Sequence, residues 1–295
     1  MNVAVIDVGS QTVRLLVACR DGRALRAVRE QKGFLGLGFE VERLGRISDD
    51  KLSETVEHVR SLARTARKAG AVRTETLVTA PGRQSENGAE LVRRLGQVTG
   101  GPVRVLSPDE EGKLAYAGAV AAADLDAKTV AVVDVGGGST EVVVGTPSGG
   151  PAWVKSFDIG ALRLTERALS DDPPGRKALA AAQGAVAAEL AGFTPPLPQA
   201  ALAAGGTARS LRKLIGGGSL GPAELDEALS ILTAQKSSRT AKRFGIEPGR
   251  ARTLAAGAII LRAVQSRLGV PFTVSRAGLR EGAVLALLEE LAAAA

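Results

Sequence analysis

The stretch that most constrains the fold of this chain is Asp134–Glu141, with the sequence DVGGGSTE. It lies between two short apolar runs, Thr129–Val133 and Val142–Val144, which are typical of buried strands. Two strands joined by so short a segment form a hairpin, and glycine at its turn permits positive φ and close approach of a ligand. Because backbone N–H groups that point one way bind phosphate oxygens, the stretch predicts a phosphate-binding hairpin.

Carboxylates stand at both ends of this stretch, Asp134 and Glu141. They would repel a bare phosphate, so a phosphate site here requires a cation. Mg²⁺ is commonly held by one or two carboxylates together with the substrate's own phosphates. The alternative is a structural glycine turn with two solvated acids, which we disfavour because the pattern occurs twice.

A second copy of the pattern opens the chain. Asn2–Ile6 is followed by Asp7-Val8-Gly9-Ser10 and then by the apolar run Val13–Ala18. Without a gap, Asp7 overlays Asp134 and Arg14 overlays Glu141. A repeated supersecondary unit predicts two similar lobes, each of which offers a phosphate-binding hairpin to a shared cleft.

Length and composition indicate a globular protein of two domains. The chain has 295 residues, of which 45% are hydrophobic and 23% are charged. Aromatic residues make up only 3%, which disfavours nucleic-acid binding on stacking platforms, although the net charge of +7 suits polyanions. No stretch approaches the length of a membrane span, and the N-terminus leaves no room for a signal peptide. With Cys19 as the single cysteine, these features predict a cytoplasmic protein that has no membrane partner.

An acidic cluster follows a short predicted strand, Val103–Leu106. Ser107 and Pro108 are strong helix-start signals, and Asp109 and Glu110 complement a helix dipole in the first turn. Two interpretations of Glu111 stay open. It also completes this first turn, or its carboxylate deprotonates a water molecule beside the phosphate hairpin.

Basic and glycine-rich segments elsewhere are weaker signals. Arg83 follows a predicted strand that ends at Pro81-Gly82, and it is either a phosphate clamp or a solvated loop residue. The turn Gly205-Gly206-Thr207 opens a predicted helix, where an anion can approach. The basic stretch Gln235–Arg252 is either a solvated helical face or a track for a long polyanion.

In their order along the chain, these motifs resemble the exopolyphosphatase / guanosine pentaphosphate phosphohydrolase family, which has the actin–Hsp70–sugar kinase fold. The matching stretches are Asp7–Ser10 with Arg14-Leu15, Thr79-Ala80 with Arg83 and Asn87, Glu110–Gly112, Asp134–Glu141, Gly160–Glu166, Gly205–Thr207 and Gly278–Gly282. The resemblance covers essentially the whole chain. Gln11 and Phe34 depart from the family pattern, which often has Asn and Arg at these positions.

The resemblance implies the site. Glu111 matches the carboxylate that activates the attacking water, and Arg83 matches an arginine that binds phosphate. The remaining expected residues bind the substrate phosphates (Ser10, Gly137, Gly138, Ser139, Thr140, Gly206 and Arg250) or hold Mg²⁺ (Asp7, Asp134 and Glu141).

The resemblance also implies the fold class. We expect an α/β protein with two ribonuclease H-like, actin-type lobes, each with a mixed five-stranded sheet, around an interlobe cleft. The expected lobes are residues 1–124 and 125–280, and the closing helix, 281–295, packs back on the first lobe. Because the sequence ends at Ala295, we expect a short form without the helical C-terminal extension of longer members.

The expected activity is that of an exopolyphosphatase, which releases terminal orthophosphate from inorganic polyphosphate with Mg²⁺ as cofactor. Alternatives are a guanosine pentaphosphate 5′-phosphohydrolase, a kinase or ATPase of the same fold, and a non-catalytic polyphosphate- or alarmone-binding module. The expected partners are therefore polyphosphate or guanosine pentaphosphate, with no specific nucleic acid. A homodimer is the oligomer favoured by symmetry base rates.

Overall fold

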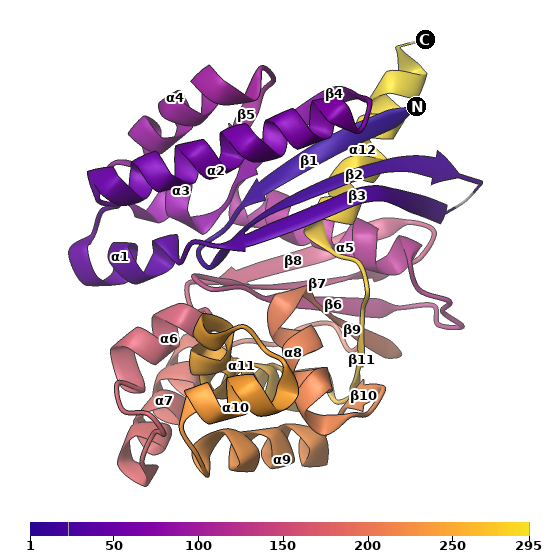
Figure 1. Cartoon of the computed structure of the whole chain (residues 1–295). Coiled ribbons are helices and arrows are strands. Elements are labelled where there is room, and N and C mark those ends of the chain that lie inside the picture. Colours follow the sequence, from indigo (N-terminus) through magenta and orange to yellow (C-terminus); the bar gives the residue numbers. More distant parts are fainter. Residues whose placement is uncertain (23, 295) are drawn as a thin grey trace.

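The structure, a computed structural model, describes residues 1–22 and 24–294. Its first lobe is built on a five-stranded sheet in the order β3-β2-β1-β4-β5 (Figure 1). The strands are β1 (Asn2–Val8), β2 (Thr12–Asp21), β3 (Ala24–Phe34), β4 (Ala71–Val78) and β5 (Val103–Val105). The helices of this lobe are α1 (Leu37–Leu44), α2 (Asp49–Lys68), α3 (Ala80–Gln84), α4 (Gly88–Thr99) and α5 (Pro108–Ala121).

The second lobe is built on a six-stranded sheet in the order β10-β11-β9-β6-β7-β8. The strands are β6 (Val130–Val135), β7 (Thr140–Thr146), β8 (Gly150–Phe157), β9 (Ala200–Ala204), β10 (Ser219–Leu220) and β11 (Phe272–Val274). Its helices are α6 (Ala161–Ala168), α7 (Arg176–Glu189), α8 (Gly205–Ile215), α9 (Pro222–Thr233), α10 (Ser237–Phe244) and α11 (Pro248–Leu268).

The two sheets share one topology. In each, an antiparallel meander of three strands continues into two parallel strands, so β8-β7-β6-β9-β11 repeats β3-β2-β1-β4-β5. The expected two-lobed α/β fold with mixed sheets is therefore present. The expectation of five strands in both sheets was wrong for the second lobe, because the two-residue strand β10 pairs with the free edge of β11.

The repeat predicted from the sequence has the same register in both hairpins. Asp7 pairs with Arg14 across β1 and β2, and Asp134 pairs with Glu141 across β6 and β7. The two turns are also closed by equivalent hydrogen bonds of 3.0 Å, from Gly9 N–H to Thr12 O and from Gly136 N–H to the Ser139 carbonyl.

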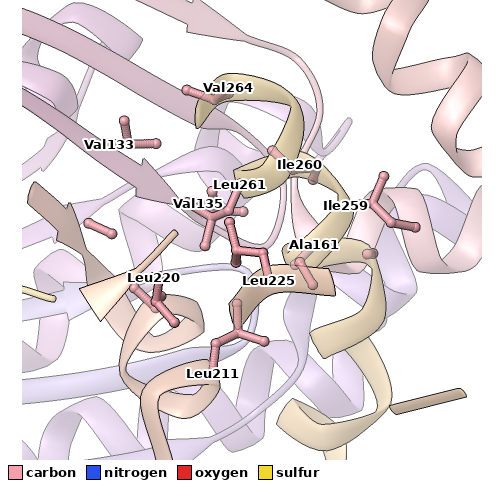
Figure 2. Packing of buried hydrophobic residues seen from close by; sticks show 14 of the residues in the cluster. Val133, Val135, Ala161, Leu211, Leu220, Leu225, Ile259, Ile260, Leu261 and Val264 are labelled. Atoms are coloured by element: carbon pink, nitrogen blue, oxygen red, sulfur yellow. The ribbon is translucent and has the colours of Figure 1, made fainter. Parts of the chain in front are cut away.

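The apolar runs that predicted strands form the core. In the second lobe, β-branched side chains of β6 and β7 pack against α11, as Figure 2 shows for Val133, Val135, Ile260 and Val264. The first lobe has one cluster under α2 and α4 and another between β1, β2 and α12 (Leu279–Ala293). Cys19 is buried, as expected of a small core residue.

The last helix returns to the first lobe. α12 lies beside α5, and its residues Val284, Leu287 and Leu288 pack with Val3 and Val5 of β1. It begins at Leu279, two residues before the predicted start of the closing helix. Ala295, the last residue of the predicted helix, lies outside the described residues.

Two local expectations were wrong. The break predicted at Pro81-Gly82 is the first turn of the short helix α3, since proline is tolerated at a helix start. The glycines of the Asp134–Glu141 turn do not adopt positive φ. They are required for space instead, because a Cβ on Gly137 would lie 2.8 Å from Cβ of Ser10 in the other lobe.

Candidate active site

A cleft of about 100 Å³ lies between the two hairpin turns. Most of the predicted site residues line it: Asp7, Ser10, Glu111, Asp134, Gly137, Gly138, Ser139, Glu141, Gly206 and Arg250. The structure thus brings together residues that are far apart in the sequence, from both lobes. Two predicted residues, Arg83 and Thr140, are not among those that line it.

The glycine turn of the second lobe is held by the start of α6. The N–H of Ala161 donates to Gly136 O at 2.9 Å, and those of Leu162 and Arg163 donate to Gly137 O at 3.0 Å. In a trans peptide the carbonyl and the following N–H point in opposite directions. The N–H groups of Gly137 and Gly138 therefore face away from α6, and both residues line the cleft, as a nest that binds an anion requires.

The turn of the first lobe is held in the same way by the segment that begins α1. The N–H of Gly38 donates to Ser10 O at 2.7 Å, while those of Leu35 and Gly36 donate to Gln11 O at 3.0 Å. The N–H groups that follow these carbonyls, of Gln11 and Thr12, consequently point away from α1. Both lobes thus present backbone donors to one cleft, and both use the N-terminal end of a helix to orient them.

Glu111 stands on the first turn of α5. Ser107 and Glu110 form a capping box there, in which the Ser107 hydroxyl accepts from Glu110 N–H and the Glu110 carboxylate accepts from Ser107 N–H. Glu110 is therefore a capping residue, whereas Glu111 is 7% exposed and lines the cleft.

The environment of Glu111 favours its protonated form. Burial raises the pKa of Glu111 to about 7; the Arg83 guanidinium opposes this rise, and the charges of Asp7 and Asp134 add to it. A carboxyl group whose pKa is near neutral is suited to exchange protons with water.

Arg83 contacts Glu111 directly. Its Nη1 donates to the Glu111 carboxylate and to Leu106 O. The guanidinium thus orients the carboxylate and favours its charged form, although Arg83 itself does not line the cleft. Thr140 also faces away from the cleft, because its hydroxyl donates to Ile159 O at 2.6 Å and the residue is fully buried. Of Thr140, therefore, only the backbone remains available to the predicted cradle.

Of the remaining carboxylates, Glu141 is buried, whereas Asp7 and Asp134 are partly exposed on the cleft wall. Burial raises the pKa of Asp7 to about 6, and it raises the pKa values of Asp134 and Glu141, where neighbouring carboxylates add to the effect for Glu141. The Ser156 hydroxyl donates to Glu141 at 2.9 Å. Several acids with unfavourable negative charge in one cleft are a donor set that suits a hard cation.

The donors fit Mg²⁺ only in part. Within residues 1–22 and 24–294, no group of three carboxylate, histidine or cysteine side chains is close enough to hold a metal. Mg²⁺ typically takes one or two carboxylates and completes its octahedron with water and substrate phosphate oxygens. The set therefore fits a magnesium–phosphate unit better than a metal bound by protein alone.

Four arginines also line the cleft: Arg14, Arg209, Arg250 and Arg280. A Cβ on Gly206 would lie 2.9 Å from Nη2 of both Arg14 and Arg250, so these two guanidinium groups approach each other over this glycine. Burial, together with the charges of Arg14 and Arg209, lowers the pKa of Arg250 to about 9. Such clustered cations suit a polyanionic ligand.

Sequence reasoning gave no role to three of these arginines. Arg14 and Arg280 lie within stretches that matched the family, and that was the available signal. Arg209 had none, because only the helical spacing from Gly205 and Gly206 brings it to the cleft.

A larger cavity of about 760 Å³ adjoins the cleft and shares its arginines. Basic side chains predominate in its lining (Arg14, Lys32, Arg209, Lys213, Arg250, Arg276 and Arg280) over the acids Glu30, Glu247 and Glu281. Phe34 lines it as well. The cavity is therefore large enough for several anionic groups beyond the cleft, and its charge suits them.

The stretch Gln235–Arg252 contributes Gly245, Ile246, Glu247 and Arg250 to the lining of this cavity, but most of its bases lie elsewhere. Its bases Lys236, Arg239, Lys242 and Arg243 lie at or on α10, outside both cavities, whereas Arg250 lines both. The basic surface of the site is assembled from β2, β3, α8, α11 and α12 instead. Among the helices that the structure describes, none is both long and apolar enough to cross a membrane.

Comparisons with known proteins point to one family. The model of the Ppx/GppA phosphatase family matches residues 16–291. Exopolyphosphatase 1 of Mycobacterium tuberculosis is 28% identical over 98% of this chain and 89% of its own length. Exopolyphosphatase 2 of the same organism is 29% identical over 97% and 98%. The crystal structure of the Aquifex aeolicus Ppx/GppA family member is 29% identical, with a TM-score of 0.83 and 98% of both chains covered. The match of the family model over nearly the whole chain shows that this protein belongs to the Ppx/GppA phosphatase family.

Proposed function

We propose that this protein is an exopolyphosphatase, which removes the terminal orthophosphate of inorganic polyphosphate. The observation that carries the proposal is the position of Glu111, a carboxyl group with a pKa of about 7, on the wall of a cleft that both glycine turns line. A general base whose pKa lies near neutral pH, opposite a set of phosphate-binding donors, is the arrangement that phosphoanhydride hydrolysis needs.

The terminal phosphate would lie between the two turns. The N–H groups of Gly137 and Gly138 would donate to its oxygens, and Ser10 and Ser139 line the same cleft. Preorganised donors of this kind stabilise the charge that develops on the transferred phosphoryl group. Arg14 and Arg250, which line the same cleft, would bind the next phosphate and stabilise the leaving group.

Glu111 would accept a proton from a water molecule in line with the scissile bond. The water oxygen forms a bond to the terminal phosphorus, and the bond to the bridging oxygen breaks, with its electron pair passing to the shortened chain. The products are orthophosphate and a polyphosphate one unit shorter. Arg83 would keep Glu111 oriented and lower its pKa, so that enough carboxylate is present at neutral pH.

Asp134, Glu141 and Asp7 would hold Mg²⁺ together with substrate oxygens. When bound, Mg²⁺ neutralises charge on the phosphates and polarises them toward attack. The cations that the structure places near Asp7 and Asp134 are Arg14, Arg209, Arg250 and Arg280. Burial lowers the pKa values of Arg14, Arg209 and Arg250, so their charged forms are also disfavoured.

The adjoining basic cavity supports polyphosphate as the substrate, since a linear chain continues from the cleft as further anionic units. The printed names of the mycobacterial relatives, both exopolyphosphatases, support the same substrate. The second candidate is a guanosine pentaphosphate 5′-phosphohydrolase. One observation favours it: Phe34 lines the cavity and offers an aromatic surface to a purine.

The test is phosphate release by the purified protein with Mg²⁺, measured in parallel on short polyphosphate, long polyphosphate and guanosine pentaphosphate. We expect release from polyphosphate, and a loss of about 10²- to 10⁴-fold in rate for Glu111→Gln. Higher kcat/KM on guanosine pentaphosphate would favour the second candidate. Tight binding without turnover would indicate a binding module, and phosphate transfer from ATP to an acceptor would indicate a kinase.

A further inference from the structure

A buried ion pair joins the two lobes beside the glycine turns. Arg163 of α6 donates through Nε to Glu42 of α1 at 2.5 Å, and their side chains are only 5% and 8% exposed. The other oxygen of Glu42 accepts from Nε of Arg167 at 3.1 Å. Arg163 also contacts Asp158 of its own lobe. Figure 1 shows α1 and α6 facing each other across the lobe boundary, and they are in contact there.

The same two helices hold the two turns. The first turn of α6, including the N–H of Arg163, binds the carbonyl oxygens of Gly136 and Gly137. The start of α1 binds Ser10 O through the N–H of Gly38. The ion pair therefore connects the supports of the two turns directly.

The two turns are packed so closely that an added side-chain atom would not fit between them. A Cβ on Gly38 would lie 2.8 Å from Cβ of Ser10 and 3.1 Å from Cδ1 of Leu162, and one on Gly137 would lie 2.8 Å from Cβ of Ser10. A glycine of one lobe thus packs directly against a side chain of the other lobe, Gly137 against Ser10 and Gly38 against Leu162. A small rotation of one lobe would separate the N–H groups that face the common cleft.

The burial of the pair makes it sensitive to such a rotation. An exposed ion pair contributes little because water replaces each partner easily. A buried charge that loses its partner is strongly unfavourable until water reaches it. The Glu42–Arg163 contact therefore favours one relative position of the lobes over positions in which the pair is only partly separated.

We propose that Glu42 and Arg163 form a latch that aligns the two glycine turns on one phosphate group. They are positioning residues, since they act through α1 and α6 and do not line the cleft. This inference rests on the proposed function for the identity of the ligand, polyphosphate, but the alignment of the lobes can be measured without it.

The kinetic test uses Glu42→Gln, Arg163→Gln and the double variant, with Glu57→Gln as the matched control. Glu57 forms exposed ion pairs within α2 alone. We expect KM for polyphosphate to rise about tenfold in the latch variants, because only the aligned fraction binds tightly, while kcat at saturation stays within about twofold. The control should keep the KM of the unmodified protein.

The double variant separates alignment from folding. It leaves no uncompensated charge between Glu42 and Arg163, so its thermal midpoint should recover relative to the single variants while its KM stays raised. A KM that recovers together with the thermal midpoint would show that the pair only stabilises the fold, and would overturn the proposal.

The structural test is the distance between nitroxide labels on Ser53→Cys in α2 and Ala223→Cys in α9, in a Cys19→Ala background. Ser53 and Ala223 are exposed and lie on opposite lobes (Figure 1). We expect Glu42→Gln to broaden the distance distribution and polyphosphate to narrow it again. If the protein released no phosphate, the proposed function would fail but the latch would not, whereas a distribution left unchanged by Glu42→Gln would overturn the latch whether or not the protein is active.

Discussion

Replacing Arg83 by methionine separates two roles for this residue, namely tuning of the base and binding of phosphate. Methionine retains much of the apolar stem but removes the guanidinium, which donates to the Glu111 carboxylate and to Leu106 O. Arg83 does not line the cleft. The structure therefore predicts that the variant acts through the pKa of Glu111.

The magnitude follows from the charges around Glu111. Burial raises the pKa of Glu111 to about 7 even though Arg83 lowers it. An opposite charge at hydrogen-bonding distance typically lowers a carboxyl pKa by about 1 to 3, so its loss should raise the pKa of Glu111 by a similar amount. Because the base must be deprotonated, kcat/KM near neutral pH should fall by about 10- to 10³-fold, and it should recover as the pH rises through the new pKa.

The assay is the pH dependence of kcat/KM for phosphate release from polyphosphate, with saturating Mg²⁺. The control is Arg104→Met, since Arg104 forms ion pairs with Glu75 and Glu110 near the same helix start but does not line the cleft. The control should keep the acidic limb of the unmodified protein. A loss in Arg83→Met that is the same at every pH would refute the reasoning and would assign Arg83 to phosphate binding.

Three further predictions concern packing, pH and charge. Gly137→Ala should lower the free energy of unfolding by about 1–3 kcal/mol and kcat/KM by roughly 10²-fold, because the new Cβ meets the other lobe at 2.8 Å. Gly184→Ala, with open space around it on α7, should be neutral or stabilising. Thermal melts and kinetics check both variants, and an active Gly137→Ala would contradict the close contact. Burial raises the pKa of Asp7 to about 6 and that of Glu111 to about 7, so the folded protein binds more protons than the unfolded chain between about pH 4 and pH 7. In EDTA the free energy of unfolding should therefore fall as the pH rises through this range, by up to roughly 3 kcal/mol per carboxyl. A free energy of unfolding in urea that does not change with pH would contradict this prediction. Lys213→Gln, in the basic cavity, should raise KM for long polyphosphate and weaken its dependence on salt, and an unchanged salt dependence would place the substrate elsewhere.

The local patterns of the sequence were sufficient for the hairpins and for the start of α5. The order of an apolar run, an acid and glycines predicted both hairpins. In the structure they share one register, with Asp7 opposite Arg14 and Asp134 opposite Glu141, because a short turn fixes the register of its strands. Ser107 and Pro108 marked the helix start correctly, since capping depends on neighbours in sequence. The same local logic failed at Pro81-Gly82, where tertiary packing supports a short helix despite the glycine.

The parts that sequence reasoning missed depend on contacts between distant segments. Arg209 and Lys213 line the cavity because of the orientation of α8 in the packed lobe. The bases of α10 lie outside the cavity because of the orientation of α10. The glycines of the second turn were assigned to positive φ, although their requirement is the 2.8 Å approach of the other lobe, which no pattern within one lobe contains.

By itself, the sequence determined the two repeated hairpins, the two-lobed fold and the acids and glycines of the cleft. These features arise from short-range periodicity, turn chemistry and motifs, which act over a few residues. Only the tertiary structure decided that Arg83 contacts Glu111 and does not line the cleft, that four arginines line one cleft, and that Glu42 meets Arg163. The physical reason is that the pKa of a group and the value of an ion pair depend on burial and on neighbours across the lobe boundary, which are properties of the packed molecule.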